Sequence, residues 1–224
     1  MLARVLEPEV MDSPAEALEY DAMDHGAVNR AFVEDFLAFV PAGPRFPDSI
    51  LDLGTGTAQI PIELCRRIPA ACITAVDLAE SMLDLGRTNL AAAGLLDRVT
   101  LERIDAKGLP YRAGEFAAVI SNSIVHHVPE PRRVLAEAIR VTEPGGYLFF
   151  RDLLRPATDA AVESLVARHA GEATPRQRAL FAASLRASLN LAEIRALVAE
   201  LGFLDQEAQQ TSDRHWTFAA RVPV

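Results

Sequence analysis

Residues 50–58 constrain the fold of this chain more than any other segment. They read Ile-Leu-Asp-Leu-Gly-Thr-Gly-Thr-Ala, so an apolar run with one carboxylate leads into two glycines, and a helical pattern begins at Gln59. A strand that passes through a glycine-rich turn into a helix brings bare backbone N–H groups close to a ligand. The segment therefore predicts an α/β unit with a ligand site at its turn.

The spacing of Gly54 and Gly56 narrows the class of ligand. A dinucleotide-binding fingerprint, Gly-x-Gly-x-x-Gly, requires a third glycine at the position where Gln59 stands. The chain instead has the pattern Asp-x-Gly-x-Gly-x-Ala, with Asp52 inside the end of the strand. This pattern resembles the first motif of the class I S-adenosylmethionine-dependent methyltransferases. Ala58 replaces the third glycine of that motif, and its methyl group is tolerable if the helix lies slightly farther from the strand.

A second acidic residue, Asp77, ends the apolar run at residues 72–77 and lies 23 positions after Gly54 (77 − 54 = 23). At the tip of the neighbouring strand, such a carboxylate can accept hydrogen bonds from both hydroxyls of a ribose. Dinucleotide sites share this feature, so Asp77 alone does not separate the two classes of site. Its alternative role is to cap the helix that begins near Glu80, but its place in the series of motifs favours ribose binding.

Two later segments continue the resemblance to the methyltransferases. Residues 99–106 predict a third strand that ends with Asp105, where the family usually hydrogen-bonds the adenine amino group. A simple turn role is the alternative for Asp105. Residues 116–128 predict the fourth strand and the loop after it, which contains His126 and His127. Paired histidines in this loop make the small-molecule and quinone-type methyltransferases the best match within the family.

The resemblance implies a cofactor, S-adenosylmethionine, and a set of residues that hold it. The glycine turn would receive the methionine portion, Asp77 the ribose, and Asp105 with Ala106 the adenine edge. Tyr20 resembles a tyrosine in the entry segment that many relatives fold over the cofactor, although an aromatic residue in an amphipathic helix fits a core position equally well. The residues expected to bind the cofactor are Asp52, Gly54, Thr55, Gly56, Asp77, Leu78, Asp105, Ala106, Asn122 and Tyr20.

Methyl transfer requires alignment of the acceptor, exclusion of water and, for a protonated nucleophile, removal of a proton. His126 and His127 are the expected catalytic residues because histidine titrates near neutral pH; packing or capping is the alternative for either one. No metal-ligand spacing surrounds Cys65 or Cys72, so no metal is expected, and both thiols are expected to be buried and reduced.

A polar cluster near the C-terminus contains Arg214, His215 and the only tryptophan, Trp216. Two interpretations of this cluster stay open. In the first, a loop enters an edge strand and the tryptophan packs inward. In the second, the three side chains line the pocket for the methyl acceptor.

The pattern along the chain predicts one domain of the α/β class. Strands and helices alternate to about Asp152, which is typical of a parallel sheet with helices on both faces. The resemblance, which covers roughly residues 46–153, implies a Rossmann-like fold. We expect a seven-stranded, mostly parallel sheet with an antiparallel last strand, the tail at residues 205–210 and 215–222 supplying the final two strands.

Two segments lie outside the alternation. Residues 1–45 are expected to form an N-terminal helical segment that covers the cofactor site, with helices broken near Gly26 and a rigid proline-rich connector at residues 41–47. Residues 46–224 would form the methyltransferase domain, in which residues 156–190 are expected to insert a small helical cap over the substrate pocket.

The global properties of the chain restrict its partners and location. A net charge of −9 opposes nucleic-acid binding, which relies on a basic surface. No stretch approaches the ~18–20 apolar residues of a membrane span, and the first residues lack the apolar region of a secretory signal. We therefore expect a cytoplasmic protein with a small-molecule acceptor, no nucleic-acid partner and no membrane span. The oligomeric state stays open, with a homodimer as one option.

The expected function is S-adenosylmethionine-dependent methyl transfer to a small-molecule acceptor, which releases S-adenosylhomocysteine. The paired histidines slightly favour O- or C-methylation of a neutral or quinone-like acceptor. The alternatives are a cofactor-binding protein without transferase activity and an S-adenosyl-dependent enzyme of other chemistry. A nicotinamide dehydrogenase is disfavoured by Gln59 and by the Pro-Gly-Gly turn expected before the fifth strand, at residues 144–146.

Overall fold

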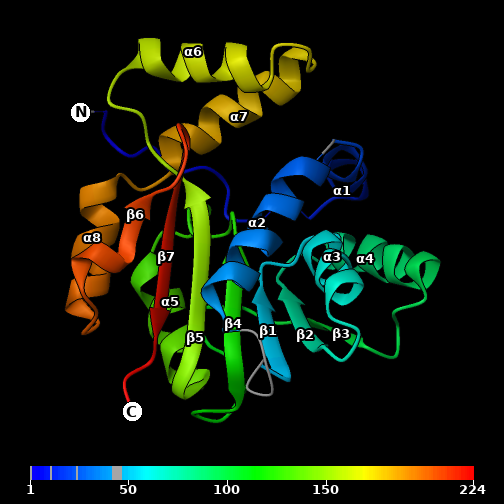
Figure 1. Ribbon diagram of the computed structural model, residues 1–224. Coiled ribbons are helices and arrows are strands. Elements are labelled where there is room, and N and C mark those ends of the chain that lie inside the picture. Colours follow the sequence, from blue (N-terminus) through cyan, green and yellow to red (C-terminus); the bar gives the residue numbers. More distant parts are fainter. Residues whose placement is uncertain (1, 11, 24, 42–46) are drawn as a thin grey trace. The chain divides into compact units, whose positions relative to one another are not determined.

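Seven strands form one sheet in this computed structural model, which describes residues 2–10, 12–23, 25–41 and 47–224 (Figure 1). The strands are β1 (Ser49–Leu53), β2 (Cys72–Asp77), β3 (Val99–Arg103), β4 (Phe116–Asn122), β5 (Thr142–Leu153), β6 (Ala208–Gln210) and β7 (His215–Arg221). Their order is β3-β2-β1-β4-β5-β7-β6. β1 pairs in parallel with β2 and β4, β2 pairs in parallel with β3, and β6 and β7 are antiparallel. The predicted sheet and its final antiparallel hairpin are confirmed.

The backbone divides into two compact units. The first unit comprises Met1–Glu9, Ser123–Arg132 and Arg151–Phe218, and the second comprises Val10–Asn122, Arg133–Phe150 and Ala219–Val224. Most of the connector expected at residues 41–47, together with the domain boundary expected at residue 45, lies outside the described residues.

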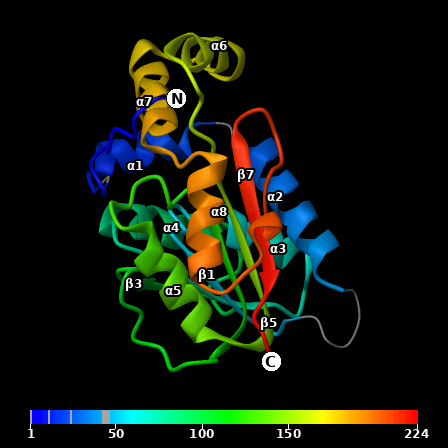
Figure 2. The ribbon, with the colours of Figure 1, turned by 90° about the vertical axis from the view of Figure 1, so that its left-hand side faces the viewer.

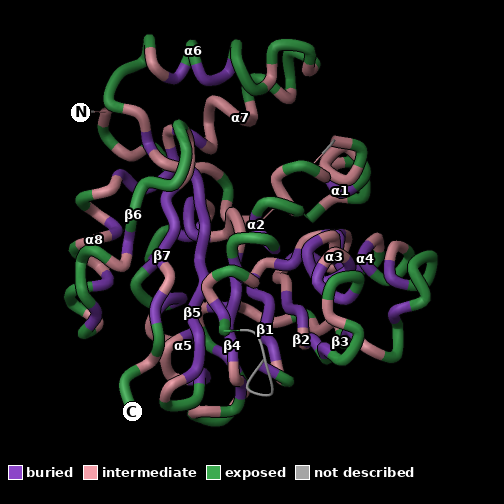
Figure 3. Tube along the Cα trace, in the orientation of Figure 1, coloured by how far each residue is buried: buried purple, intermediate pink, exposed green. Residues whose placement is uncertain are grey.

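The second unit contains the glycine turn and the strands around it. Its helices are α1 (Pro14–Asp21), α2 (Gly26–Phe39), α3 (Gln59–Arg67), α4 (Glu80–Ala93) and most of α5 (Pro131–Val141). α2 and α3 lie on one side of the strands and α5 on the other (Figure 2). The core is aromatic where α2 meets β5, because the rings of Phe32 and Phe36 lie 5.2 and 5.7 Å from that of Phe149. Continuous burial of β1 and β4 fits strands covered on both faces (Figure 3).

The first unit contains α6 (Asp159–His169), α7 (Pro175–Ala187) and α8 (Leu191–Glu200), together with the short 3-10 helix Asp205–Glu207. α6, α7 and α8 each begin at a polar cap: Thr158 accepts the N–H of Ala161, while Thr174 and Asn190 form reciprocal capping boxes. α6 and α7 share an apolar core that includes Val162, Leu165 and Leu185. The helical pair predicted after residue 156 is therefore present.

Several sequence predictions need correction. β3 ends at Arg103, so Asp105 lies beyond the strand instead of closing it. Residues 143–146 belong to the long strand β5 and do not form a separate tight turn, although Gly145 has a φ of 80°. Gly146 is needed there because a Cβ would lie only 2.8 Å from the Ala117 carbonyl oxygen. Cys72, expected to be buried, is exposed.

No helix within the described ranges is both long enough and apolar enough to cross a membrane.

Candidate functional site

The turn between β1 and α3 has three residues in the left-handed region of backbone space. Gly54, Gly56 and Ala58 have φ values of 71°, 55° and 64°. The backbone N–H groups of Gly54 and Thr55 both bond to the carbonyl of Val76, at 2.9 and 3.0 Å, and so tie the turn to the end of β2. Glycine adopts this conformation at little cost, whereas alanine at the third position costs about 1 kcal/mol or more.

Ala58 is accommodated by a glycine on a neighbouring helix. The Ala58 side chain is fully buried, and a Cβ built on Gly86 of α4 would lie 3.4 Å from the Ala58 Cβ. The absence of a side chain at Gly86 therefore leaves room for the methyl group that replaces the third glycine of the motif. This contact between α3 and α4 was not foreseen from the sequence.

Asp77 links the glycine turn to the loop that follows β2. Its Oδ2 accepts the N–H of Gly56 at 2.8 Å, and its Oδ1 accepts the N–H of Ala79 at 2.9 Å. Burial raises the pKa of Asp77, and these two backbone hydrogen bonds oppose the shift. Ala79 is itself the N-cap residue of α4, so Asp77 holds the start of that helix without being its N-cap. Ribose binding by Asp77 stays a prediction.

Asp52 is buried beside the same turn, with 1% of its surface exposed. Its Oδ2 and the Oγ1 of Thr55 have no hydrogen-bond partner in the described part of the chain. Burial raises the pKa of Asp52 to about 7; the nearby Thr55 hydroxyl opposes the shift and the charge of Asp77 adds to it. A carboxyl group held in this way favours a cationic or hydrogen-bond-donating ligand.

Tyr20, on α1, lies against the turn. Its Cε1 would be 3.7 Å from a Cβ on Gly56. Burial and the negative charges of nearby carboxylates raise the pKa of Tyr20 to about 12. The position of α1 is fixed by Asp21, whose Oδ1 accepts hydrogen bonds from Gln59 at 3.1 Å and from Asn89 at 3.0 Å. Tyr20 thus lies next to the expected cofactor-binding residues.

Asp105 is more exposed than the other expected cofactor-binding acids. Its side chain is 45% exposed, and its Oδ1 accepts the N–H of Lys107 at 2.9 Å and pairs with the Lys107 ammonium at 3.1 Å. Slight burial raises the pKa of Asp105, but the Lys107 contacts outweigh it and the net shift is downward. The geometry is that of a turn residue, which leaves adenine binding untested. Nearby, Ala106 is buried and Leu78 half-buried, and the carbonyl of Leu78 accepts the Nε of Arg103 at 3.1 Å.

In the first unit, His126 forms a buried pair with Asp152. The Nδ1 of His126 lies 2.5 Å from Oδ1 of Asp152, whose Oδ2 accepts the His126 backbone N–H at 3.1 Å. An ionised carboxylate only accepts hydrogen bonds, so Nδ1 carries the proton, and Nε2 is the nitrogen that lies 3.5 Å from the Oε1 of Glu7. Burial lowers the pKa of His126, but Asp152 and Glu7 outweigh burial and leave it raised. For Asp152, burial raises the pKa, and the charge of His126 reverses that shift to a net lowering.

His127 packs against His126, with ring centroids 4.1 Å apart and the ring planes tilted by 35°. Burial, followed by the charge of His126, lowers the pKa of His127 to about 3, so this ring is neutral at physiological pH. Its Nδ1 lies 3.1 Å from the Oε1 of Glu7 without hydrogen-bond geometry. The structure thus gives the two expected catalytic histidines different environments.

The N-terminal segment holds in place the loop after β4 that contains His126 and His127, here called the histidine loop. Arg4 donates from Nη2 to the carbonyls of Val125, His126 and Val128, at 3.4, 3.2 and 3.0 Å, and from Nε to the carbonyl of Ala187 at 2.6 Å. Glu7 follows on the same segment, and its carboxylate oxygens lie 3.1 and 3.3 Å from the Ser184 Oγ. Burial raises the pKa of Glu7.

Arg4, Glu7 and Ser184 were not predicted as site residues. Arg4 and its partners in the histidine loop are 121 to 124 positions apart, and Glu7 and Ser184 are 177 apart. No local sequence pattern indicates such contacts. Asp152 carried a weak signal, since it is an acid near the end of an apolar run.

The structure agrees in part with the first interpretation of the C-terminal cluster, in which a loop enters an edge strand and the tryptophan packs inward. Trp216 is fully buried, as expected for a tryptophan that packs inward. Its strand, β7, lies between β5 and β6, so the expectation of an edge strand was wrong. The Arg214 guanidinium lies 5.8 Å from the ring centroid of Phe181 on α7, and His215 Nδ1 is 2.9 Å from the Ser212 hydroxyl. Burial, then the charge of Arg214, lowers the pKa of His215 to about 4.

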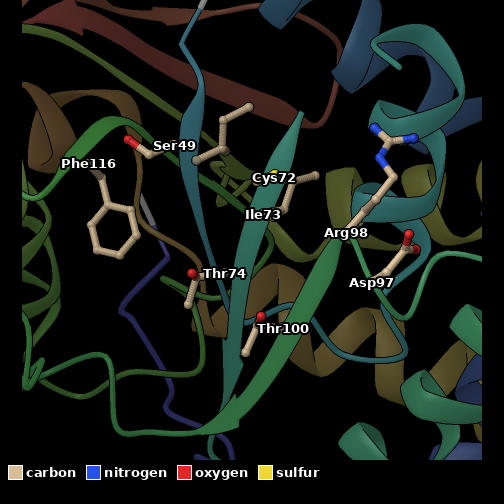
Figure 4. Close-up of a pocket in the computed structure, with 9 residues that line it drawn as sticks. Ser49, Cys72, Ile73, Thr74, Asp97, Arg98, Thr100 and Phe116 are labelled. Atoms are coloured by element: carbon tan, nitrogen blue, oxygen red, sulfur yellow. The ribbon is translucent and has the colours of Figure 1, made fainter. Parts of the chain in front are cut away.

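A cavity of about 270 Å³ in the second unit lies away from these residues. Ser49 and Cys72, the first residues of β1 and β2, line it together with Asp97, Arg98 and Phe116 (Figure 4). Open parallel sheets bind ligands at the carboxyl ends of their strands, and this cavity is at the amino ends. We therefore place the candidate site at the glycine turn instead.

Comparisons with known proteins show which family and fold the chain resembles. The profile of a family described as a methyltransferase domain matches residues 50–146. The chain is 37% identical over 138 residues to malonyl-[acyl-carrier protein] O-methyltransferase of Geobacter sulfurreducens, covering 60% of this chain and 48% of that protein. It is 33% identical over 135 residues to the ubiquinone/menaquinone biosynthesis C-methyltransferase UbiE of Cereibacter sphaeroides, covering 59% of this chain and 53% of that protein. The chain thus spans about half the length of these curated relatives.

Solved structures share the fold over most of the chain. A SAM-dependent methyltransferase from Aquifex aeolicus superposes with a TM-score of 0.68 at 15% identity, covering 95% of this chain and 100% of that one. The plantazolicin methyltransferase BpumL, in complex with a monoazolic desmethylPZN analog and SAH, gives a TM-score of 0.72 at 14% identity, with 93% and 89% coverage. These two likenesses concern the fold alone.

Proposed function

Because the chain belongs to the class I S-adenosylmethionine-dependent methyltransferases, we propose that it transfers the methyl group of S-adenosylmethionine to a small-molecule acceptor and releases S-adenosylhomocysteine. The observation that carries the proposal is a polar cradle in the second unit, which we define as the glycine turn at residues 54–56 together with Asp52, Asp77 and Asn122. There Asp77 bonds to the backbone of Gly56, and Asp52 lies close enough to Asp77 for their charges to interact.

The residues of this cradle suit the cofactor chemically. The Oδ2 of Asp52, the Oγ1 of Thr55 and the Oδ1 of Asn122 are buried atoms without a hydrogen-bond partner among the residues described. Unpaired buried oxygens are costly, and the amino and hydroxyl groups of the cofactor can satisfy them. The left-handed turn at Gly54 and Gly56 leaves backbone next to the site free of side chains.

Each predicted residue has a role in this proposal. Asp52, Thr55, Asn122 and the Gly54–Gly56 turn would hold the methionine portion. Asp77 would bind the ribose, because each of its carboxylate oxygens keeps a lone pair beyond the backbone bonds it already accepts. S-adenosylmethionine, when bound, supplies an activated sulfonium methyl group. The adenine edge would contact Asp105, Ala106 and Leu78. Tyr20 and the N-terminal segment up to residue 45 would cover the cofactor.

His126 is the residue we assign to removal of the acceptor proton. Asp152 fixes its Nδ1 as the donor, which leaves Nε2 to accept a proton, and the carboxylate stabilises the resulting imidazolium. His127 would then act on the orientation of the acceptor or on the exclusion of water, since its pKa of about 3 makes it a poor base near neutral pH.

The acceptor class is the finer part of the proposal. We favour O- or C-methylation of a neutral or quinone-like small molecule, with residues 156–190 forming a cap over the acceptor. The net charge of −9 supports this class over nucleic acids. A cytoplasmic location and either a monomer or a homodimer fit the proposal.

Calorimetric titration with S-adenosylhomocysteine, with NAD as the parallel ligand, tests the cofactor assignment. Micromolar binding of the first alone is the expected result. An acceptor panel monitored by release of S-adenosylhomocysteine then tests transfer. Absence of S-adenosylhomocysteine binding to the folded protein would contradict the proposal, and tight binding without turnover over a broad panel would favour a binding protein that lacks transferase activity.

A further inference from the structure

The side chains of Glu7, His126 and His127 converge in the first unit, and one potential ligand atom of each lies within 4.8 Å of the other two. Glu7 Oε1 is 3.5 Å from His126 Nε2 and 3.1 Å from His127 Nδ1. The side chains are 11%, 4% and 24% exposed, so they form a largely buried cluster.

Hydrogen bonds around the cluster orient His126 and Glu7. The Nδ1 of His126 is held by Asp152 at 2.5 Å, and its Nε2 lies 3.5 Å from the Oε1 of Glu7. The Nδ1 of His127 makes no hydrogen bond and lies 3.1 Å from the same oxygen. The hydroxyl of Ser184 holds the Glu7 carboxylate.

This arrangement has the features of a metal site. Metal-binding histidines usually donate their second ring N–H to a carboxylate or a backbone carbonyl, which fixes the tautomer and orients the ring. Ligands about 2.0–2.1 Å from a tetrahedral zinc ion are separated by roughly 3.3 Å, close to the two distances measured from Glu7. Two histidines and one glutamate form a known donor set for Zn²⁺, with the fourth position left for water or a substrate.

We propose that Glu7, His126 and His127 form a binding site for one divalent transition-metal ion, with Zn²⁺ as the best match to the donors. Asp152 and Ser184 supply the hydrogen bonds that hold His126 and Glu7 in position. A cation at this point balances the buried carboxylates of Glu7 and Asp152 and removes the repulsion between the inward lone pairs. The fourth coordination position would take water or an oxygen of the acceptor.

Metal binding by this cluster does not depend on the proposed methyl transfer. The Nε2 of His126 cannot hold a metal ion and accept a proton at the same time. Bound metal and base catalysis by His126 are thus two alternative states of the cluster. In the metal-bound state, an acceptor hydroxyl in the open position would lose its proton more readily because the cation lowers its pKa.

The test is titration of tag-free protein, stripped with EDTA, with Zn²⁺ by calorimetry and with Co²⁺ by visible absorption. Binding of about one ion per chain is expected, with a Co²⁺ spectrum typical of four-coordinate nitrogen and oxygen ligands and little response to Mg²⁺, which prefers oxygen ligands. Glu7→Gln and His127→Ala should each weaken binding by about tenfold or more. His169→Ala is the matched control, because His169 is bonded to Asp213, outside the cluster, and its loss should leave binding unchanged.

The possible outcomes are distinct. Loss of metal binding in Glu7→Gln and in His127→Ala, with binding retained in His169→Ala, supports the site. If His127→Ala does not fold, the result for Glu7→Gln decides the test. Absence of Zn²⁺ and Co²⁺ binding to the folded wild-type protein overturns it, as does binding that neither ligand variant weakens. Titration of the same preparation with S-adenosylhomocysteine shows separately whether the cofactor assignment stands.

Discussion

The Asp77 carboxylate accepts the backbone N–H of Gly56 at 2.8 Å, and this bond couples the end of β2 to the glycine turn after β1. The second oxygen of the same carboxylate accepts the N–H of Ala79 at the start of α4. One buried charge thus fixes two loops that belong to the expected cofactor site. Asp77 therefore contributes to the shape of the site as well as to its proposed contacts.

Replacement of Asp77 by alanine should weaken S-adenosylhomocysteine binding by about 1–3 kcal/mol, since ribose hydroxyls lose a charged acceptor and the turn loses a restraint. Calorimetry measures the change. Asp97→Ala is the matched control, because Asp97 is an exposed aspartate at the opposite ends of the strands. Equal affinity of the Asp77 variant and the wild type would remove Asp77 from the ribose role.

Asp52 should make the stability of the ligand-free protein depend on pH. Its pKa in the folded state is about 7, against an ordinary value of 3.8, so the folded protein binds this proton more tightly than the unfolded chain does. The corresponding stabilisation is complete below about pH 3.8 and is lost as the pH rises through about 7. Relative to the wild type, Asp52→Asn should therefore gain free energy of unfolding across this range, by at most on the order of 4 kcal/mol.

Urea unfolding of both proteins at about pH 5 and about pH 8 measures this difference, because other titrating groups cancel between them. A gap between the two proteins that does not change with pH would mean that Asp52 does not titrate between these two values, which would contradict a pKa of about 7.

His126→Ala and Asp152→Asn should slow methyl transfer without weakening cofactor binding. A positioned general base contributes about 10²–10⁴-fold to the rate, so losses in kcat of that order are expected for His126→Ala. Turnover in the presence of EDTA, once an acceptor is known, and calorimetry with S-adenosylhomocysteine give the two readouts. Parallel losses of turnover and cofactor affinity would point to a packing role. His169→Ala should retain the kcat of the wild type.

Gly146→Ala should destabilise the fold by about 1–3 kcal/mol or more, because the added methyl group would overpack β5. Its Cβ would lie 2.7 Å from Thr142 Cγ2 and 2.8 Å from the Ala117 carbonyl oxygen. Gly108→Ala is the control, since no atom lies within 4 Å of a Cβ at that position. Thermal unfolding compares the two variants, and similar melting temperatures would show that β5 can shift at little cost.

The architecture of the sheet could be predicted because its signals are local. The apolar run that contains Asp52 and the one that ends in Asp77 mark two strands, and the glycine turn marks the passage from strand to helix. The caps at Thr174 and Asn190 also lie next to the helices they begin. Errors occurred where backbone geometry decides the outcome. Gly145 and Gly146 look like a turn, but they let a long strand approach its neighbours closely.

The candidate site was less predictable than the fold. The residues of the glycine turn are adjacent in the chain, so their association follows from the motif. The cluster around His126 depends on Glu7 and Ser184, which are 177 positions apart, and no periodicity in the sequence joins them. The pKa of His126 is raised and that of His127 is lowered, and these opposite shifts arise from burial and from Asp152, neither of which the pair itself reveals.

The hydrogen bonds that Arg4 donates to the histidine loop and to Ala187 have a consequence for the order of folding. Arg4 is synthesised before its acceptors, which are the carbonyls of residues 125, 126 and 128 and of Ala187, up to 183 positions later. Contacts of such long sequence separation cost loop-closure entropy before they stabilise the chain, so we expect them to form late. A nascent chain that already has β1, β2 and the glycine turn still lacks the geometry of the histidine cluster. That cluster is complete only when α7 has been synthesised and the start of the chain has returned to it.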